Sequence, residues 1–422
     1  MTDEKAQATH GVLSQRGSEE LRAIAKQRGW SDESMAKLER ARVPLSALRM
    51  WPWEIPEERV ESQIDWHVRL RDSGLRGRQA TTADNEAFSD LWHNSPERIG
   101  DWEITCERGP DAFAQFKLQE SVTLTVFTEG ERMVACVGWS RRNVLVAGKR
   151  LSVTYGQALR VHDAARRQGF GDQVRRFSWP APDTRPNHTQ YDIMRSGNFA
   201  VVNWWTKHIP NFFEAVPQSE GHVPGVPISV AQLPARPGRG DGTGIRLGRR
   251  EDLARCVALL NRTHGGLDLF RPYSEEFLEA TLDEHFWGER PDYFTSVYGW
   301  RDYHVLEENG RIVACAGLWD RGRDFRERWR HRDGDEERTI ADTHLLDWGY
   351  EQGAEEAMAR LVDHLLTSTH ALGRDHLVIG LDYQDGLAAA LAGFEPVPEE
   401  RRLRWDLADV PMIRPYTDLR YW

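Results

Sequence analysis

A strand-like segment, residues 151–162, leads into a loop rich in arginine and glycine, and a helix-like segment, residues 173–179, follows it. The loop consists of Arg166, Arg167, Gln168, Gly169, Phe170, Gly171 and Asp172. Backbone N–H groups at the start of a helix bind an anion without any side-chain charge. The two glycines allow the backbone to approach a phosphate closely, and the two arginines add cationic donors. The spacing fits neither the G-x-G-x-x-G dinucleotide fingerprint nor the G-x-x-x-x-G-K-[ST] phosphate loop.

The residues before the loop make the pattern more specific. Leu159, Arg160 and Val161, together with the loop that begins at Arg166, fit the pattern L-x-V-x-x-x-x-R-x-x-G-x-G. This pattern resembles the acyl-coenzyme A motif of the GNAT superfamily of N-acetyltransferases. The segment that begins at Asn198 is similar to the N-x-x-a-x-x-x-Y-x-K segment of the same family.

The resemblance implies where acyl-coenzyme A binds. In the family, the motif strand and the next strand splay apart, and pantetheine bonds to main-chain groups in the gap, which here are those of Leu159 and Val161. The pyrophosphate would lie on the loop amides, and Asn198 would contact pantetheine. The expected co-substrate is acetyl-coenzyme A, with no metal. The expected cofactor-binding residues are Leu159, Arg160, Val161, Arg166, Arg167, Gln168, Gly169, Phe170, Gly171, Asp172 and Asn198.

The resemblance leaves the proton transfer open. A protonated amine cannot attack a thioester, so a base or a water relay is required. Many family members have a glutamate six residues before the motif valine, where this chain has Tyr155. A phenol with a pKa of about 10 is a poor base, so Tyr155 is either the catalytic residue, acting through water, or a core aromatic. Trp205 replaces the tyrosine that is the usual general acid, so the thiolate would leave unaided or take a proton from water. His162 and an α-carboxylate after residues 418–422 are the other possible bases.

The sequence contains the same pattern twice. Residues 132–138 match residues 311–317 at five of seven positions, and each heptapeptide follows a glycine turn and a β-rich run. Both halves therefore predict a β-hairpin. Residues 78–84 parallel residues 246–252, and each segment ends in an aspartate just before a helix-like segment. A duplicated domain explains the matched order of these blocks.

These observations predict an α/β chain of two tandem GNAT-like domains, each a mixed central sheet flanked by helices. The expected boundaries are a helical N-terminal extension at 1–72, a GNAT domain with the acyl-coenzyme A site at 73–233, a linker at 234–244 and a degenerate GNAT-like domain at 245–422.

The second half lacks the glycine loop. Residues 346–356 stand in its place and contain no arginine but four acidic residues, Asp347, Glu351, Glu355 and Glu356. Negative charge at the start of a helix stabilises the helix but repels a pyrophosphate. The second half is therefore expected to support the first and to wall the acceptor cleft, with one acyl-coenzyme A bound per chain.

Composition narrows the function classes. The chain of 422 residues has 66 acidic and 55 basic residues, a net charge of −11, which argues against nucleic acid as a partner. The longest apolar run, residues 133–139, is too short to span a membrane. Four scattered cysteines and an N-terminus without an apolar signal segment predict a reduced, cytoplasmic protein. Residues 321–338, a run of mixed charge, predict a solvated loop or helix face.

The sequence therefore favours a GNAT-type N-acetyltransferase that transfers an acyl group, most simply acetyl, from coenzyme A to a small-molecule amine by direct attack. Two alternatives stay open: a non-catalytic module that senses acyl-coenzyme A or an amino acid, and a transferase that takes aminoacyl groups from tRNA. The acceptor and the oligomeric state are not readable from the residues.

Overall fold

A computed structural model gives the fold of the chain. It describes residues 22–23, 26, 29–41, 60, 64–65, 68, 72, 74–166, 188–195, 226–238, 240, 242–283, 297–381, 386–405 and 414–421. The chain forms two compact units. Unit 1 comprises Met1–Thr81, Thr123–Gly138 and Ala158–Pro186, and unit 2 comprises Thr82–Val122, Trp139–Gln157 and Asn187–Trp422.

Unit 1 contains α2 (Asp32–Arg40), β1 (Leu75–Gln79), the 3₁₀ turn η4 (Asp163–Ala165) and parts of three strands, β4 (Val122–Glu129), β5 (Arg132–Val146) and β6 (Lys149–Val161). Ser31 caps α2 by accepting a hydrogen bond from the Ser34 N–H at 3.3 Å. Strand β1 runs antiparallel to β4. Strands β5 and β6 each have residues in both units, and the first residue of β4, Val122, also belongs to unit 2.

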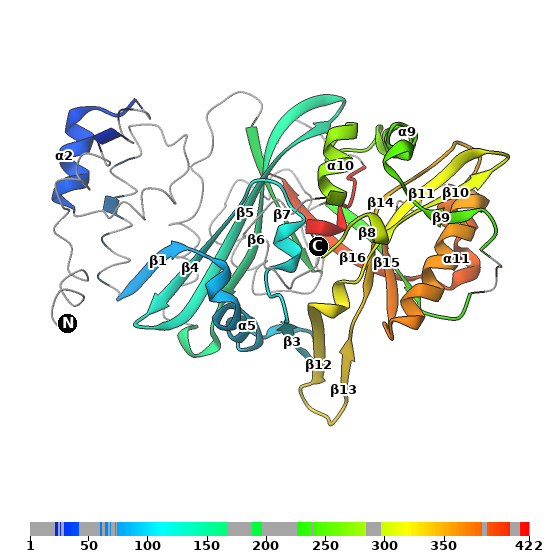
Figure 1. Cartoon of the computed structure of the whole chain (residues 1–422). Coiled ribbons are helices and arrows are strands. Elements are labelled where there is room, and N and C mark those ends of the chain that lie inside the picture. The colour runs from blue at the N-terminus through cyan, green and yellow to red at the C-terminus, as the bar shows by residue number, and fades with distance from the viewer. Residues whose placement is uncertain are drawn as a thin grey trace, which may run out of the picture. The chain divides into compact units, whose positions relative to one another are not determined.

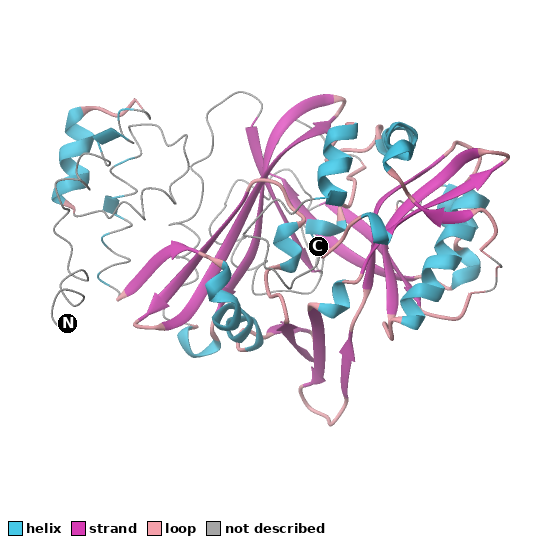
Figure 2. Cartoon of the chain, in the orientation of Figure 1, coloured by secondary structure: helices cyan, strands magenta, loops and turns pink. Residues whose placement is uncertain are grey.

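Unit 2 holds the remaining elements (Figures 1 and 2). Its α-helices are α5 (Asn85–His93), α6 (Ala114–Lys117), α9 (Leu253–His264), α10 (Glu275–Asp283), α11 (Glu355–Ala371) and α12 (Gly386–Ala390). Its strands are β2 (Glu97–Ile99), β3 (Trp102–Arg108), β7 (His188–Arg195), β8 (Val226–Pro234), β9 (Ile245–Leu247), β10 (Tyr303–Glu308), β11 (Arg311–Trp319), β12 (Phe325–His331), β13 (Glu337–Ile340), β14 (Thr343–Tyr350), β15 (His376–Gly380) and β16 (Val397–Trp405). Its 3₁₀ turns are η3 (Thr82–Asp84), η6 (Arg250–Asp252), η7 (Trp300–Asp302), η8 (Arg321–Arg323), η9 (Ala392–Phe394) and η10 (Leu419–Tyr421).

Alternate residues of the unit 2 strands supply two separate cores. In β10, Val305 packs in the core that contains α9, whereas Leu306 packs in the core that contains α11. Because successive side chains of a strand point to opposite faces, α9 and α11 cover opposite faces of the sheet. Helix α11 ends where its apolar face ends, and Gly373, with φ of +68°, follows its last turn.

The strands of the two sequence halves interleave in the main sheet of unit 2. The strand order there is β5-β6-β7-β16-β8-β15-β14-β11-β10-β9. Strand β8, from the first half, lies between β16 and β15 of the second half, and β16 lies between β7 and β8. Neither half therefore completes its sheet alone. The domain boundaries expected from the sequence stay a prediction.

The predicted repeat is confirmed at several points. Both hairpins form, β4 with β5 around Gly130 and β10 with β11 around Asn309 and Gly310, and all three turn residues have positive φ. In both halves an opening strand and a 3₁₀ turn precede a helix, β1 before α5 and β9 before α9. Two equivalent hydrogen bonds join the hairpins to later strands: His162 N–H to Val134 O, and Glu351 N–H to Val313 O, each 2.8 Å.

The prediction for residues 321–338 was wrong. This segment forms β12 and part of β13, and β12 pairs antiparallel with β3 from the first half along its whole length. Some of its charges are paired across strands, as in the pair of Arg328 with Glu337 at 2.6 Å, which is why the run lacks apolar alternation. Among the helices that the structure describes, none is long and apolar enough to cross a membrane.

Candidate functional site: the motif strand and a buried ion network

The motif strand β6 carries the predicted residues that can be placed. Leu159 is 39% exposed, and Ala158 before it has φ of +53° and a carbonyl that accepts a hydrogen bond from the Cys136 thiol at 3.0 Å. Arg160 and Val161 end the strand. Arg166 Nε donates to the Val161 carbonyl at 3.2 Å, so this arginine folds back onto the strand end. Arg167, Gln168, Gly169, Phe170, Gly171, Asp172 and Asn198 lie outside the described residues.

The pairing between β6 and β7 stops part-way along β6. These strands run parallel from the pair Ser152–His188 to the pair Gly156–Asp192. Strand β7 continues to Arg195 but pairs there with β16 on its other side. Gln157, the next residue of β6, follows the last pair of this ladder. Its side-chain amide exchanges hydrogen bonds with that of Gln119, at 2.5 and 3.1 Å. The ladder thus ends just before the motif, where the resemblance implies that the strands part.

The second half has the same break, and the C-terminal segment 414–421 (the tail) packs beside it. Strand β14 pairs in parallel with β15 only at Thr343 and His344. Beyond this point the tail lies against β15: a Cβ on Gly380 would meet the carbonyl oxygen of Thr417 at 2.6 Å. The tail is fixed further along by Asp268, whose carbonyl accepts from the Tyr416 N–H at 2.6 Å. All the tail residues from Tyr416 to Tyr421 are buried.

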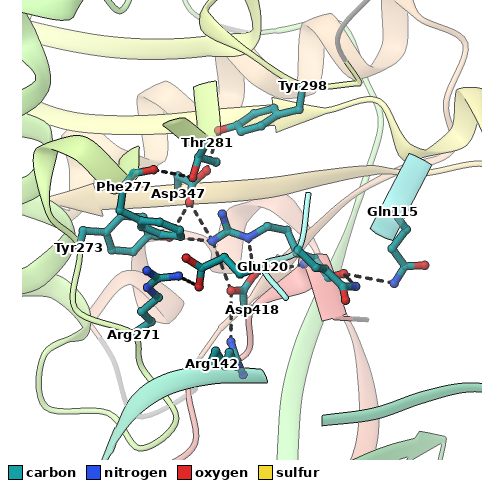
Figure 3. A network of polar contacts seen from close by, with 12 residues as sticks. Gln115, Glu120, Arg142, Arg271, Tyr273, Phe277, Thr281, Tyr298, Asp347 and Asp418 are labelled. Atoms are coloured by element: carbon teal, nitrogen blue, oxygen red, sulfur yellow. Dashed lines mark hydrogen bonds and ion pairs between the residues drawn. The ribbon is translucent and has the colours of Figure 1, made fainter. Parts of the chain in front are cut away.

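Charged side chains from four separate segments meet around the tail, and they form the ion network drawn in Figure 3. Arg420 lies at its centre and is 3% exposed. Its Nε donates to Asp418 at 2.9 Å, and its Nη2 contacts both Tyr273 Oη at 2.8 Å and Asp347 at 2.9 Å. Arg142, from β5, reaches Asp418 at 3.3 Å.

Tyrosines complete the network around its second carboxylate. Asp347 accepts from Tyr273 Oη at 2.5 Å and from Tyr298 Oη at 3.0 Å, and its side chain is fully buried. Burial raises the pKa of both tyrosines well above the ordinary value, so they stay neutral donors. Tyr298 occupies space that Gly317 leaves open, since a Cβ there would overlap the phenol oxygen at 1.7 Å.

Asp418 and Arg420 hold each other in their charged forms. Burial alone would raise the pKa of Asp418, but attraction to Arg420 and Arg142 outweighs it and holds that pKa below its usual value. Burial would lower the pKa of Arg420, and the two carboxylates Asp347 and Asp418 more than reverse this effect. The Arg420–Asp418 pair therefore stays ionised and acts through its position.

A small pocket (the tail pocket) opens onto this network, with about 10 Å³ of free space, room for roughly one water molecule. Its polar lining residues are Glu120, Arg142, Arg271, Asp418 and Arg420. Its apolar and aromatic lining residues are Leu118, Tyr273, Phe277, Tyr416 and Tyr421. Arg271 pairs with Glu120 and stacks over the Phe277 ring, with the guanidinium carbon 3.5 Å from the ring centre (Figure 3).

Tyr155, the predicted catalytic residue, is tied to the tail. It is buried, its ring stacks on Tyr191 with centroids 4.9 Å apart, and its hydroxyl donates to the Tyr421 carbonyl at 2.7 Å. The same tail is held from the other side by Gln119, whose amide donates to the Arg420 carbonyl at 2.6 Å. This geometry makes Tyr155 a positioning residue for the tail, and its part in proton transfer stays a prediction.

The acidic residues Asp347 and Glu351 do not form the uncompensated negative charge that the sequence predicted in the second half. Asp347 does not precede a helix: it lies within β14, with φ of +47°, and Arg420 neutralises it. Glu351 is ion-paired with Arg255, Arg262 and Arg311, so distant arginines supply the offsetting charge that the local sequence lacks. What stands beside the β14–β15 break is the tail itself.

The ion network was missed in the sequence. The signal was a lone carboxylate, Asp347, in the strand-like segment 343–350, because a buried carboxylate requires a buried partner. The alternation of charge and aromatic residues at 418–421 was the second signal. Nothing local connects the two, which are about seventy residues apart. In the part of the chain that the structure describes, no group of three or more His, Cys, Asp or Glu side chains could hold a metal ion.

Comparisons with known proteins give the class of fold. No protein-family model matches the sequence, and no curated protein matches it. Among solved structures, Saccharomyces cerevisiae N-myristoyltransferase with bound myristoyl-CoA is similar, with a TM-score of 0.54 and 11% identity over 79% of this chain and 84% of that chain. A GCN5-related N-acetyltransferase from Sphaerobacter thermophilus has a TM-score of 0.46 and 16% identity, over 82% of this chain and 98% of that chain.

The chain thus has an α/β fold with repeated halves that is similar to the fold of N-myristoyltransferase. At 11% identity this similarity concerns the fold alone. What the chain does must be argued from its own residues.

Proposed function

We propose that the chain is an acyl-coenzyme A-dependent N-acyltransferase that acylates a small-molecule amine, with acetyl the simplest acyl group. One observation carries the proposal: the strand that bears the L-x-V-x-x-x-x-R-x-x-G-x-G pattern is the strand whose ladder with β7 ends at Gly156, three residues before Leu159. A break at that place would leave main-chain groups of the motif available for an extended ligand to bond, as a strand added to a sheet edge does.

In this proposal, the motif and the loop after it would bind acyl-coenzyme A for direct attack by the amine. The main chain of Leu159 and Val161 would hold pantetheine, the amides of the loop 168–172 would hold the pyrophosphate, and Arg166 would stay near it by its bond to the strand end. The thioester, once bound, supplies an activated carbonyl. The acceptor nitrogen attacks the carbonyl carbon, a C–N bond forms, the C–S bond breaks, coenzyme A leaves as thiolate, and the surplus proton on nitrogen passes to water.

The tail and Tyr155 would shape the acceptor side. Their hydrogen bond joins β6 to the ion network, so residues 149–157 of β6 and the acceptor-side pocket are parts of one arrangement within unit 2. A rigid acceptor site would align the nitrogen for attack, and such alignment lowers the barrier of a reaction that has no acyl-enzyme intermediate.

The experiment is a thiol-release assay with acyl-coenzyme A donors from acetyl to myristoyl, each against a panel of small amines. We expect release that depends on both the donor and an amine, and that Gly171→Asp abolishes. The matched control is Gly393→Asp, at an exposed position where an added Cβ meets nothing within 4 Å. Binding of acyl-coenzyme A without turnover on any amine would contradict the enzyme proposal and favour a sensor.

A further inference from the structure

The centre of the ion network contains buried donors that nothing in the described chain accepts. Arg420 uses Nε and Nη2 on Asp418, Tyr273 and Asp347, but its Nη1 is buried with no hydrogen-bond partner among the described residues. The Nε of Arg142 is in the same state. A buried guanidinium N–H without an acceptor is costly, so such a group usually has a water or a ligand as its partner.

The carboxylates around the tail pocket are already engaged. Asp418 is held by Arg420 and Arg142, and Glu120 is held by Arg271. The unmet hydrogen-bonding capacity of the described lining residues is therefore on donors, not on acceptors. A ligand that fits must bring an acceptor, and a positively charged group would meet three arginines with no free carboxylate to receive it.

We propose that the tail pocket binds the carboxylate of the acceptor, so that the amine substrate is an amino acid or another amine that carries a carboxylate. Arg420 Nη1 donates to one carboxylate oxygen, and Arg271 donates at the mouth of the pocket. This inference rests on the proposed function, since it names the class of amine that the same enzyme acylates.

Charge and size favour a carboxylate over a larger anion. The network has three cations, Arg142, Arg271 and Arg420, against three anions, Glu120, Asp347 and Asp418. A single added negative charge is tolerated beside the surplus donors, whereas a phosphate dianion would place two further charges near three carboxylates. The free space is about that of one water, so one carboxylate oxygen fits beside Arg420, and the rest of the group requires the Arg271–Glu120 side of the pocket to move outward.

The pocket has one side that can adjust. The side chains of Arg271 and Glu120 are 26% and 24% exposed, while Arg420 and Asp418 are 3% and 7% exposed. The Arg271–Glu120 pair is therefore the mouth and the Arg420–Asp418 pair is the floor. A partly exposed pair exchanges partners at less cost than a buried pair, so Arg271 can turn from Glu120 to an incoming carboxylate. The aromatic rings of Tyr273 and Phe277 flank the mouth and suit an apolar portion of the substrate.

The test compares acceptors that differ only at the carboxylate. ω-Amino acids of increasing length and α-amino acids are each paired with the corresponding carboxamide, and kcat/KM is measured with acetyl-coenzyme A as donor. In the ω-series the remote carboxyl group leaves the amine pKa almost unchanged, so nucleophilicity is matched. We expect the acid to exceed its amide by at least ~10-fold in kcat/KM, mostly through KM.

Two variants localise the effect. Arg271→Gln should reduce the acid-over-amide preference at least ~10-fold, and Arg255→Gln should leave it unchanged. Arg255 is a matched control because its side chain is 24% exposed and also paired with a glutamate, Glu351, away from the pocket. Equal kcat/KM for acid and amide, or a preference that survives Arg271→Gln, would overturn the inference while leaving the acyltransferase proposal intact.

A binding experiment separates the two failures. If no amine is acylated with any donor, the proposed function fails, and the pocket is then tested by thermal stabilisation of the protein by the same acids and amides. Stabilisation by the acids alone, lost in Arg271→Gln, supports a carboxylate site. No difference between acid and amide means that the pocket holds only a water, and the inference is wrong.

Discussion

The packing of the tail against β15 makes one substitution unusually informative. Gly380 ends β15, and an alanine Cβ at that position would lie 2.6 Å from the Thr417 carbonyl oxygen and 2.9 Å from Thr417 Cβ. Both distances are shorter than any relaxed contact, and the first involves backbone, so the tail must shift in Gly380→Ala.

The cost follows from general overpacking values. Inserting one methyl group into a packed interior costs about 1–3 kcal/mol, and replacing glycine returns about 0.4–1 kcal/mol by restricting the unfolded chain. The expected net loss of stability for Gly380→Ala therefore lies between about 0 and 2.6 kcal/mol, with a midpoint of about 1.3 kcal/mol. The displaced tail also carries Arg420 and the Tyr421 carbonyl, so the KM for the acceptor should rise while affinity for acyl-coenzyme A changes little.

The assay is urea unfolding followed by tryptophan fluorescence, with acceptor KM measured in parallel. Gly393→Ala is the matched control, because that glycine is exposed, has no positive φ and has no atom within 4 Å of the position that an alanine Cβ would take. Equal stability and equal KM in the two variants would refute the packing of the tail at β15.

Three further predictions follow: the first concerns Tyr155, the second compares Asp347 with Glu351, and the third concerns His304. Tyr155→Phe leaves the buried Tyr421 carbonyl without its donor and should lower the free energy of unfolding by about 1–2 kcal/mol. If the Tyr155 hydroxyl also relays a proton, kcat falls at least ~30-fold while affinity for the cofactor is unchanged. A near-normal kcat from pH 6 to 9 excludes the relay. Asp347→Asn removes the fully buried partner of an arginine and should cost about 3–5 kcal/mol, against about 1 kcal/mol or less for Glu351→Gln, whose side chain is 20% exposed; similar losses in urea unfolding would contradict the network. Burial, and to a lesser extent repulsion from His364, lowers the pKa of His304. The unfolded chain therefore binds more protons than the folded chain, and stability should fall as the pH drops below about 6.5. His304→Gln should flatten the plot of stability against pH in that range, and an unchanged plot would refute this assignment.

The sequence predicted the local parts of this fold well, because each part is encoded within a short window. The hairpin around Asn309 and Gly310 follows from the turn residues, and the helix that begins at Leu253, just after Asp252, follows from its periodicity. The interleaving of β8 between β15 and β16 could not be predicted, since strand order depends on packing between segments more than 140 residues apart.

The site divides in the same way. The motif strand was identified from a contiguous pattern, and β6 does run from Lys149 to Val161. Asp347 and Arg420 were not predicted to meet, because an ion pair between two distant segments leaves no periodic trace in either. The error about Glu351 has the same origin: its three arginines come from α9 and β11, not from neighbouring residues.

The central claim is that the first half binds acyl-coenzyme A through the glycine loop, while the second half, with the tail packed at its strand break, does not. Titration calorimetry with a non-hydrolysable acetyl-coenzyme A analogue tests it most directly. The account predicts one site per chain, weakened by more than ~2 kcal/mol, or roughly 30-fold, in Gly171→Asp and unaffected in Gly393→Asp. Two equivalent sites, or one site that survives Gly171→Asp in a folded protein, would contradict it.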